Sequence, residues 1–208
     1  MEFWNTFVEN LVNTSLWEFA AVVLGIASVW YARREHILVY PTGIVSVVIY
    51  VFICFSARLY ADAGINFFYF VMSVYGWYNW TRKDEKAQVL HISANTPRQQ
   101  LAGIALTVAS YWLILGLIWA FNHDDVVYMQ SWVPWVDSFT TAIFLTGMLL
   151  MARKKVENWV YWIIGDVVSI PMYFMKGLVF TSFQYVVFLL IAIMGYLEWR
   201  RRLNMQDR

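Results

Sequence analysis

The sequence predicts an all-α integral membrane protein with seven transmembrane helices, arranged as two parallel three-helix repeats joined by a connector helix. Three observations lead to this prediction. Hydrophobic residues make up 61% of the 208 residues and charged residues only 14%, against about 45–50% and about 25% in soluble domains. Several apolar runs approach the roughly 20 residues that a helix needs to cross a bilayer. Short motifs of the first half also return in the second half in the same order.

Seven apolar segments are long enough to be spans. We expect helices, because a helix satisfies its own backbone hydrogen bonds in lipid, whereas a barrel needs strict alternation, which the sequence lacks. The N-terminal stretch has no basic region of the kind that opens a cleaved signal, so we expect no processing. The predicted spans are 16–32, 37–55, 62–80, 101–121, 135–152, 158–175 and 178–199.

The second and third spans carry polar residues that are candidates for substrate binding. The second span has a short polar face made by Ser46 and Tyr50. Their hydroxyls, and the amides and hydroxyls of the third span, could hold a sugar, although such groups also tie membrane helices together. Trp80 could equally belong to an interfacial tryptophan belt. The third span carries its polar stripe at helical spacing, with Asn79 beside it: Asp62, Asn66, Tyr69, Ser73, Trp77 and Trp80.

The fourth span is the connector, and it follows the longest polar stretch of the chain, KDEKAQVLHISANTPRQQ. That stretch is typical of a cytoplasmic loop.

In the seventh span, Gln184 and Tyr185 are the deepest polar groups. The same span contains no lysine. A retinal photoreceptor also has seven helices, but it needs a lysine there for its Schiff base, so we set that class aside.

The sixth span carries the strongest functional signal. Trp159, Trp162, Asp166, Ser169 and Tyr173 follow one another by three or four residues and therefore share one helical face. Asp166 would lie about 12 Å into the bilayer, where a charged side chain costs about 2.5–3.5 kcal/mol and is by default functional. Aromatic faces that lead to a carboxylate predict a site for a flat cationic ring. Two other readings stay open, a structural role for Asp166 and an interfacial role for Trp159.

Basic residues predict the orientation in the membrane. The loops after the odd-numbered spans hold 13 of the 15 lysines and arginines, and the opposite side has only Arg58 and Lys176. The positive-inside rule then places the N-terminus outside and the C-terminus in the cytoplasm. The 13 residues are Arg33, Arg34, Arg82, Lys83, Lys86, Arg98, Arg153, Lys154, Lys155, Arg200, Arg201, Arg202 and Arg208.

The internal repeat pairs the first three spans with the last three. YARRE (31–35) aligns with MARKK (151–155), SVVIY (46–50) with SIPMY (169–173), and GWYNWTR (76–82) with GYLEWRR (195–201). One connector span returns the second triplet to the orientation of the first, so the repeats are parallel and a substrate would bind between them near mid-membrane. The chain is thus one transporter domain, residues 1–208. Its predicted parts are repeat one at 16–80, the connector helix at 101–121 and repeat two at 135–199.

Several other functions are not supported. A net charge of +1 gives no reason to expect a nucleic-acid partner, and a single cysteine, Cys54, excludes an internal disulfide. The three histidines, His36, His91 and His123, share no helix face, so we expect no metal site. The motifs of hydrolases, metalloproteases and phosphate-binding loops are missing. We therefore expect no cofactor and no enzymatic activity.

The sequence resembles the bacterial nicotinamide riboside transporters of the PnuC type from about Glu18 to Arg201. The segments that carry the resemblance are ILVYPTGIVSVVIYVFICF, LYADAGINFFYFVMSVYGWYNW and ENWVYWIIGDVVSIPMYFMKGL. The motif at the end of the third span is met by Trp77, Asn79 and Trp80. The motif of the sixth span is met by Asn158, Trp159, Trp162 and Asp166.

The resemblance implies a fold related to the SWEET sugar transporters, assembly as a homotrimer, and a location in the bacterial inner membrane. It implies uptake of nicotinamide riboside, a precursor of NAD, by facilitated diffusion with trapping by a cytoplasmic kinase. Thiamine or another vitamin is the alternative substrate, and an intramembrane enzyme or receptor is the alternative class. The expected substrate-binding residues are Trp162, Asp166, Trp159, Asn158, Tyr173, Ser169, Asn66, Tyr69, Trp77, Asn79, Trp80, Tyr50 and Gln184.

Overall fold

The computed structural model describes residues 12, 15–57, 60–83, 90–122 and 124–206. Arg58, Lys86, His123 and Arg208, which entered the predictions above, lie outside these residues. Within the described ranges the chain is mainly helical, and an isolated bridge pairs Ser93 with Lys155. The helices are α2 (Leu16–Arg33), α3 (Val39–Ser56), α4 (Tyr60–Thr81), α5 (Pro97–Asn122), α6 (Val126–Gln130), α7 (Val133–Ala152), α8 (Asn158–Met175) and α9 (Val179–Gln206).

Each of the seven predicted spans coincides with one long helix, and α6 is an additional short helix that the sequence analysis did not predict. Helices α2, α3, α5, α7 and α9 are long and apolar enough to cross a membrane. The protein is therefore an all-helical membrane protein with several spans. Helices α4 and α8 are not in that group, and both carry polar residues, including Asn66 in α4 and Asp166 in α8.

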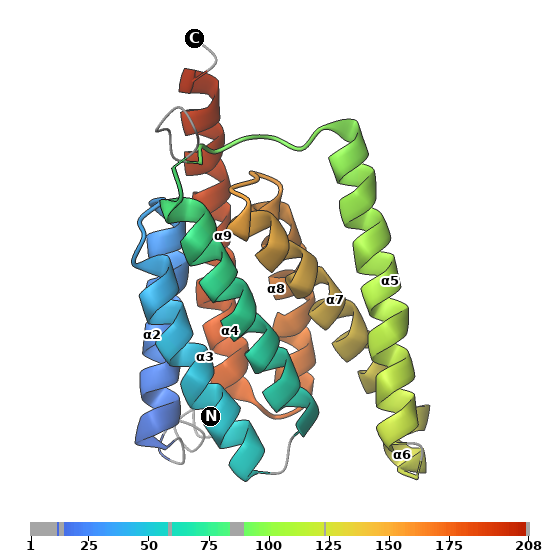
Figure 1. Cartoon of the computed structure of the whole chain (residues 1–208). Coiled ribbons are helices and arrows are strands. Elements are labelled where there is room, and N and C mark those ends of the chain that lie inside the picture. The colour runs from blue at the N-terminus through green and yellow to red at the C-terminus, as the bar shows by residue number, and fades with distance from the viewer. Residues whose placement is uncertain (1–11, 13–14, 58–59, 84–89, 123, 207–208) are drawn as a thin grey trace.

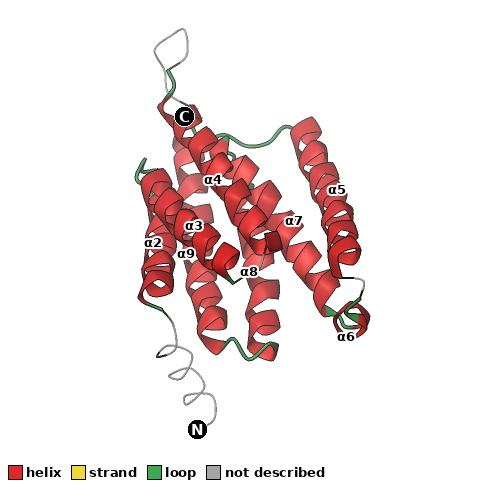
Figure 2. Cartoon of the chain, turned by 60° about the horizontal axis from the view of Figure 1, so that its bottom comes forward, coloured by secondary structure: helices red, strands yellow, loops and turns green. Residues whose placement is uncertain are grey.

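Six helices form a closed ring. Helix α3 packs against α2 and α4, α8 packs against α7 and α9, and the ring closes where α4 meets α7 and α9 meets α2 (Figure 1). Helix α5 stands outside the ring and packs along α7, which Figure 2 shows from a second direction. The ring brings helices from both halves of the chain around one central axis, where a transport site is expected.

Helices α2, α4, α7 and α9 have their C-terminal ends at the same end of the ring, with basic residues in or directly after them. We call this the basic end. The connection 90–96 crosses this end, and its Ile92 is buried among the tryptophans of the core. It is held there by backbone hydrogen bonds, from Ser93 to the Lys154 carbonyl and from Val156 to the Ser93 carbonyl. The opposite end, which carries α6, is called the outer end.

The turns after α2 and α7 have the same conformation. Glu35 and Lys154 both adopt a left-handed backbone, with φ of 59° and 49°. This region is disfavoured for residues with a side chain, so other contacts must hold the two turns. The direct contact is an ion pair between the two residues themselves, with Lys154 Nζ 2.6 Å from Glu35 Oε1.

Candidate functional site

A column of stacked aromatic rings runs between α7, α8 and α9. Phe144 and Trp162 have ring centroids 5.3 Å apart at an interplanar angle of 26°. Phe144 and Tyr185 follow at 6.1 Å and 20°, and Tyr185 and Tyr173 at 5.0 Å and 14°. These distances are within the range of favourable offset stacking. The column presents several nearly parallel faces, which suit a flat ring.

Two glycines allow the rings to lie between the helices. A Cβ at Gly165 would overlap the Phe144 ring, and a Cβ at Gly147 would lie 3.4 Å from the Trp162 indole. Any larger residue at Gly165 would push α7 and α8 apart or displace the Phe144 ring. The close approach of α7 and α8 is therefore a condition for the column.

Asp166 lies one helical turn from Trp162 and is 2% exposed. In the part of the chain that the structure describes, its carboxylate has no hydrogen bond and no ion pair, although it is near enough to Tyr185 to interact electrostatically. A buried charge without a partner is costly and is normally paired. The carboxylate can therefore accept a cationic ligand without first breaking a contact with the protein.

The structure brings part of the predicted site to this column. Trp162, Asp166 and Tyr173 are there from α8, and Tyr69 of α4 packs against the same apolar cluster from across the ring. Ser169 is fully buried, and its hydroxyl has no hydrogen-bond partner in the described chain.

A second group of predicted residues lies at the basic end instead. Asn79 Nδ2 donates to the Ala152 carbonyl at 2.8 Å, and Trp80 Nε1 donates to the Met151 carbonyl at 3.2 Å. Asn158 Nδ2 donates to the Lys155 carbonyl. The donors of Asn79 and Trp80 are thus engaged by the C-terminal end of α7, which ties α4 to α7. The donor of Asn158 is engaged by the turn before α8, which fixes the start of that helix.

Tryptophans fill the interior of the basic end. Trp159 is 1% exposed and meets Trp199 edge to face, with centroids 5.5 Å apart at 88°. Trp80 lies 6.0 Å from Trp199 and meets Tyr40 edge to face at 5.2 Å. The four rings join α3, α4, α8 and α9 and leave little room for a ligand between them.

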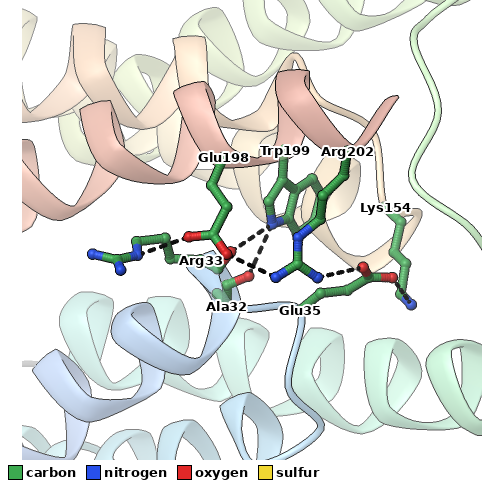
Figure 3. A network of polar contacts seen from close by, with 7 residues as sticks. All are labelled: Ala32, Arg33, Glu35, Lys154, Glu198, Trp199 and Arg202. Carbon is green, nitrogen blue, oxygen red and sulfur yellow. Dashed lines mark hydrogen bonds and ion pairs between the residues drawn. The ribbon is translucent and has the colours of Figure 1, made fainter. Parts of the chain in front are cut away.

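Charged groups close the same end (Figure 3). Glu35 pairs with Lys154 at 2.6 Å and with Arg202 at 3.1 Å, and Arg202 also pairs with Glu198 at 2.7 Å. Arg33 reaches the other oxygen of Glu198 at 3.1 Å. The network connects α2, α9 and the α7–α8 turn. Opening the basic end therefore requires these ion pairs to separate.

Four predicted residues are not brought to the column. Trp77 is 40% exposed on the outside of the bundle. Asn66 Nδ2 donates to the Asp62 carbonyl of its own helix at 2.9 Å. Gln184 is half-buried on α9, as is Tyr50 on α3, and neither stacks on the column. The assignment of these four residues to a substrate site stays a prediction.

Sequence reasoning missed Phe144 and both glycines of the α7–α8 contact. In the sequence Phe144 is one of many apolar residues in the fifth predicted span, and nothing in the local pattern marks it. Tyr185 was recognised as a deep polar group but was not assigned to the site. Only the packing of three helices shows that these rings stack.

A surface cleft lies elsewhere on the described chain. It has a volume of about 560 Å³ and lies between α5, α6 and α7 near the outer end, lined by residues such as Trp112, Met129 and Trp135. Its lining is mostly apolar and contains no charged side chain. It therefore lacks the convergent polar groups that a site for a small cation requires.

Comparisons with known proteins were made for the whole chain. The family model described as "Nicotinamide mononucleotide transporter" matches residues 15–201. The chain is 28% identical over 200 residues to the nicotinamide riboside transporter PnuC of Escherichia coli (strain K12), covering 88% of this chain and 84% of that protein. It is 25% identical over 186 residues to the riboflavin/roseoflavin transporter RibM of Streptomyces davaonensis, covering 89% and 85%.

A solved structure has the same fold. The crystal structure of the vitamin B3 transporter PnuC aligns with a TM-score of 0.70 and 23% sequence identity, covering 98% of this chain and 88% of that chain.

Proposed function

Since the chain belongs to the nicotinamide mononucleotide transporter family, we propose that it takes up nicotinamide riboside and holds the cationic ring of this substrate at Asp166 and Trp162. The protein is a membrane transporter and not an enzyme, as its family and relatives are transporters. The relative from Escherichia coli carries the name of a nicotinamide riboside transporter. The observation that carries the proposal is the buried, unpaired carboxylate of Asp166 beside the aromatic column.

The chemistry of nicotinamide riboside fits these groups. Its pyridinium ring is flat and positively charged. Indole and phenol faces attract a cation by about 0.5–2 kcal/mol, and the carboxylate supplies the opposite charge. The hydroxyls of Tyr69 and Ser169 lie at the same column or on the same helix and are candidate partners for the ribose.

The same site disfavours the phosphorylated form. A mononucleotide would bring a phosphate close to Asp166, and like charges at short distance in a low-dielectric site repel strongly. Two lysines near the helix ends are already occupied. Lys154 is paired with Glu35, and Lys176 is paired with Asp137 at 2.8 Å. The riboside is therefore favoured over the mononucleotide.

Riboflavin is the second candidate, because the relative from Streptomyces davaonensis is a riboflavin/roseoflavin transporter. Its isoalloxazine ring is also flat and would stack on the same column. It is uncharged, however, and would leave the Asp166 carboxylate buried without a counter-ion. Thiamine is a cation and remains an alternative, so the three vitamins must be compared directly.

We also propose that the ring of six helices consists of two parallel repeats, α2–α4 and α7–α9, with α5 as the connector. Supporting this, α3 and α8 begin 119 residues apart and also end 119 residues apart. The same offset relates two contacts in the interior. Gly76 faces the Tyr40 ring, and Gly195 faces the Trp159 ring.

This register differs from the sequence alignment at two of its three motifs, by one residue for YARRE and MARKK and by four residues for SVVIY and SIPMY. An offset of 119 pairs Ser46 with Gly165, whereas the alignment of SVVIY with SIPMY pairs Ser46 with Ser169. The difference is four residues, about one helical turn. A shift of one turn keeps the same residues on the inner face, which is why similarity between short apolar segments did not detect it.

The transport cycle follows from this arrangement. The basic end is proposed to face the cytoplasm, in accordance with the positive-inside rule, with the N-terminus outside and the protein in the bacterial inner membrane. Substrate would enter at the outer end, bind at the column and leave when the two repeats rock and the network around Glu35 opens. Facilitated diffusion and a homotrimer are further parts of the proposal, and both derive from the family resemblance.

The test is a titration of the purified protein in detergent with four ligands: nicotinamide riboside, nicotinamide mononucleotide, riboflavin and thiamine. We expect the riboside to bind most tightly and the mononucleotide at least about tenfold more weakly, as expected for a buried charge mismatch of more than about 1.4 kcal/mol. Tighter binding of riboflavin or thiamine would replace the proposed substrate. Tighter binding of the mononucleotide would contradict the role of Asp166.

A further inference from the structure

We propose that Phe144 determines which ring the transporter accepts, because its phenyl ring lies stacked in the column at the place where the flat ring of the substrate would bind. This inference rests on the proposed function and names a specificity-determining residue for it. Phe144 is on α7, whereas the residues expected to bind the substrate from sequence lie mainly on α4 and α8.

The geometry around Phe144 is that of a ring between two faces. Trp162 stacks on it at 5.3 Å and Tyr185 at 6.1 Å, with interplanar angles of 26° and 20°. The phenyl ring has six members, as does the pyridinium ring of nicotinamide. A pyridinium in its place would contact two aromatic faces and would lie next to the helical turn that carries Asp166.

The fold itself does not require an aromatic residue at this position. In the 119-residue register, Phe144 and Gly165 of the α7–α8 contact correspond to Gly25 and Ser46 of the α2–α3 contact. There a Cβ at Gly25 would lie 3.3 Å from the Ser46 hydroxyl, which donates to the Ala21 carbonyl at 2.7 Å. A glycine and a serine are thus sufficient to pack this helix pair, and the large ring on α7 serves another purpose.

A second pair in the same register shows the same asymmetry. Gly147 faces Trp162 in the α7–α8 contact, and Ser28 faces Gly43 at the corresponding place in the α2–α3 contact. The second repeat therefore supplies the aromatic wall, and the first repeat supplies small residues. A substrate ring that displaces Phe144 would therefore meet aromatic faces at the α7–α8 contact, whereas the α2–α3 contact offers none at the corresponding positions.

Ring size then decides which substrate is accepted. A single pyridinium ring needs Phe144 to turn aside by about the width of one ring. The three fused rings of riboflavin would need the whole space that Phe144 occupies. Since Phe144 is only 8% exposed and is packed against Gly165, a larger displacement of its ring disturbs more of the surrounding packing. The phenyl ring would therefore exclude a flavin more strongly than a pyridinium.

The test uses the full-length protein with Phe144→Ala and Phe144→Leu, and with Leu150→Ala as the matched control. Leu150 lies on the same helix and in the same apolar cluster, is 6% exposed and is not in the column. Affinities for nicotinamide riboside and for riboflavin are measured by titration, after size-exclusion chromatography and a thermal melt have shown which variants are folded.

We expect Phe144→Ala to shift the riboflavin-to-riboside affinity ratio towards riboflavin by at least about 10- to 200-fold, the range that a single methylene contributes in an apolar pocket. Phe144→Leu, which keeps most of the volume but not the flat shape, should give a smaller shift, and it serves as the test where the alanine variant does not fold. Leu150→Ala should leave the ratio unchanged.

An unchanged ratio in a folded Phe144 variant, or an equal shift in Leu150→Ala, would overturn the role of Phe144. The proposed substrate is judged separately, by the wild-type protein. Wild type that binds riboflavin in preference to the riboside contradicts the proposed function, while a ratio that changes only at Phe144 still supports its role. Absence of binding of both vitamins to every folded variant would overturn both.

Discussion

Replacement of Asp166 by asparagine separates binding from stability. Asparagine keeps the size and one acceptor oxygen of the side chain and removes the charge. Asp166 is 2% exposed, and its carboxyl group has no partner in the described chain, so the ionised form of this side chain is buried at a cost in the wild-type protein. Relief of a buried unsatisfied group is worth about 1–3 kcal/mol, and the variant should therefore be more stable than wild type by a few degrees in its melting temperature.

The effect on binding has the opposite sign. An interaction between a buried charged group and its ligand contributes about 1.5–3 kcal/mol net, which corresponds to about 10- to 150-fold in affinity. Asp166→Asn should lose this amount for nicotinamide riboside, which is a cation. It should lose much less for the reduced form of the riboside, which is neutral. The ratio of the two affinities is thus the direct measure of the counter-ion role.

The assay combines a thermal melt and titrations with both forms of the riboside on the purified variant. Asp137→Asn is the matched control, because it also removes a carboxylate but leaves Lys176 without its partner at 2.8 Å. The control should gain no stability and should keep the wild-type preference. If Asp166→Asn is less stable than wild type and keeps the preference for the cation, Asp166 is a structural residue and the counter-ion role is wrong.

Three further predictions concern Trp162, Lys154 and the orientation in the membrane. Trp162→Phe should retain part of the riboside affinity and Trp162→Ala should lose about 5- to 150-fold, since stacking and cation–π attraction together contribute roughly 1–3 kcal/mol; equal affinities in a titration would exclude stacking at Trp162. Lys154→Met should destabilise the protein by up to about 3 kcal/mol because it leaves Glu35 paired only with Arg202. A thermal melt should show that adding Glu35→Gln restores part of the lost stability. If no stability is restored, loss of the ion pair is not the cause. In a background without Cys54, a membrane-impermeant thiol reagent should label a cysteine at Asp125 in intact cells and miss one at Arg153, both of which are exposed positions; reversed labelling would overturn the orientation.

Part of the candidate site could be predicted from the sequence for a simple reason. A carboxylate within an apolar helix raises the free energy of inserting that helix into lipid. Asp166 can therefore be selected as a candidate functional residue without knowledge of its neighbours in space. Trp162 and Tyr173 follow from it by helical spacing. The same spacing also includes Trp159, which the structure buries among the tryptophans of the basic end. Helical spacing defines a face of a helix, but a face passes through several environments along its length.

The hydrogen-bond acceptors of the polar side chains at the end of α4 belong to another helix. Asn79 and Trp80 have the composition of a sugar-binding motif, and their donor groups are engaged by carbonyls at the end of α7. Those carbonyls are more than 70 residues away in the chain. Sequence spacing within one helix contains no information about such a partner.

The sequence by itself determined the properties that depend on local composition: an all-helical membrane protein, the positions of its long helices, the family and the deep carboxylate. Hydrophobicity and helical periodicity are properties of neighbouring residues, and lipid selects them one segment at a time. The tertiary structure alone decided that Phe144, Tyr185 and Trp162 form one column, that Asp166 has no partner in the described chain, and that Glu35 pairs with Lys154 across 119 residues. These features depend on how helices far apart in the sequence pack together, because stacking and ion pairing act over a few ångströms in space and are independent of distance along the chain.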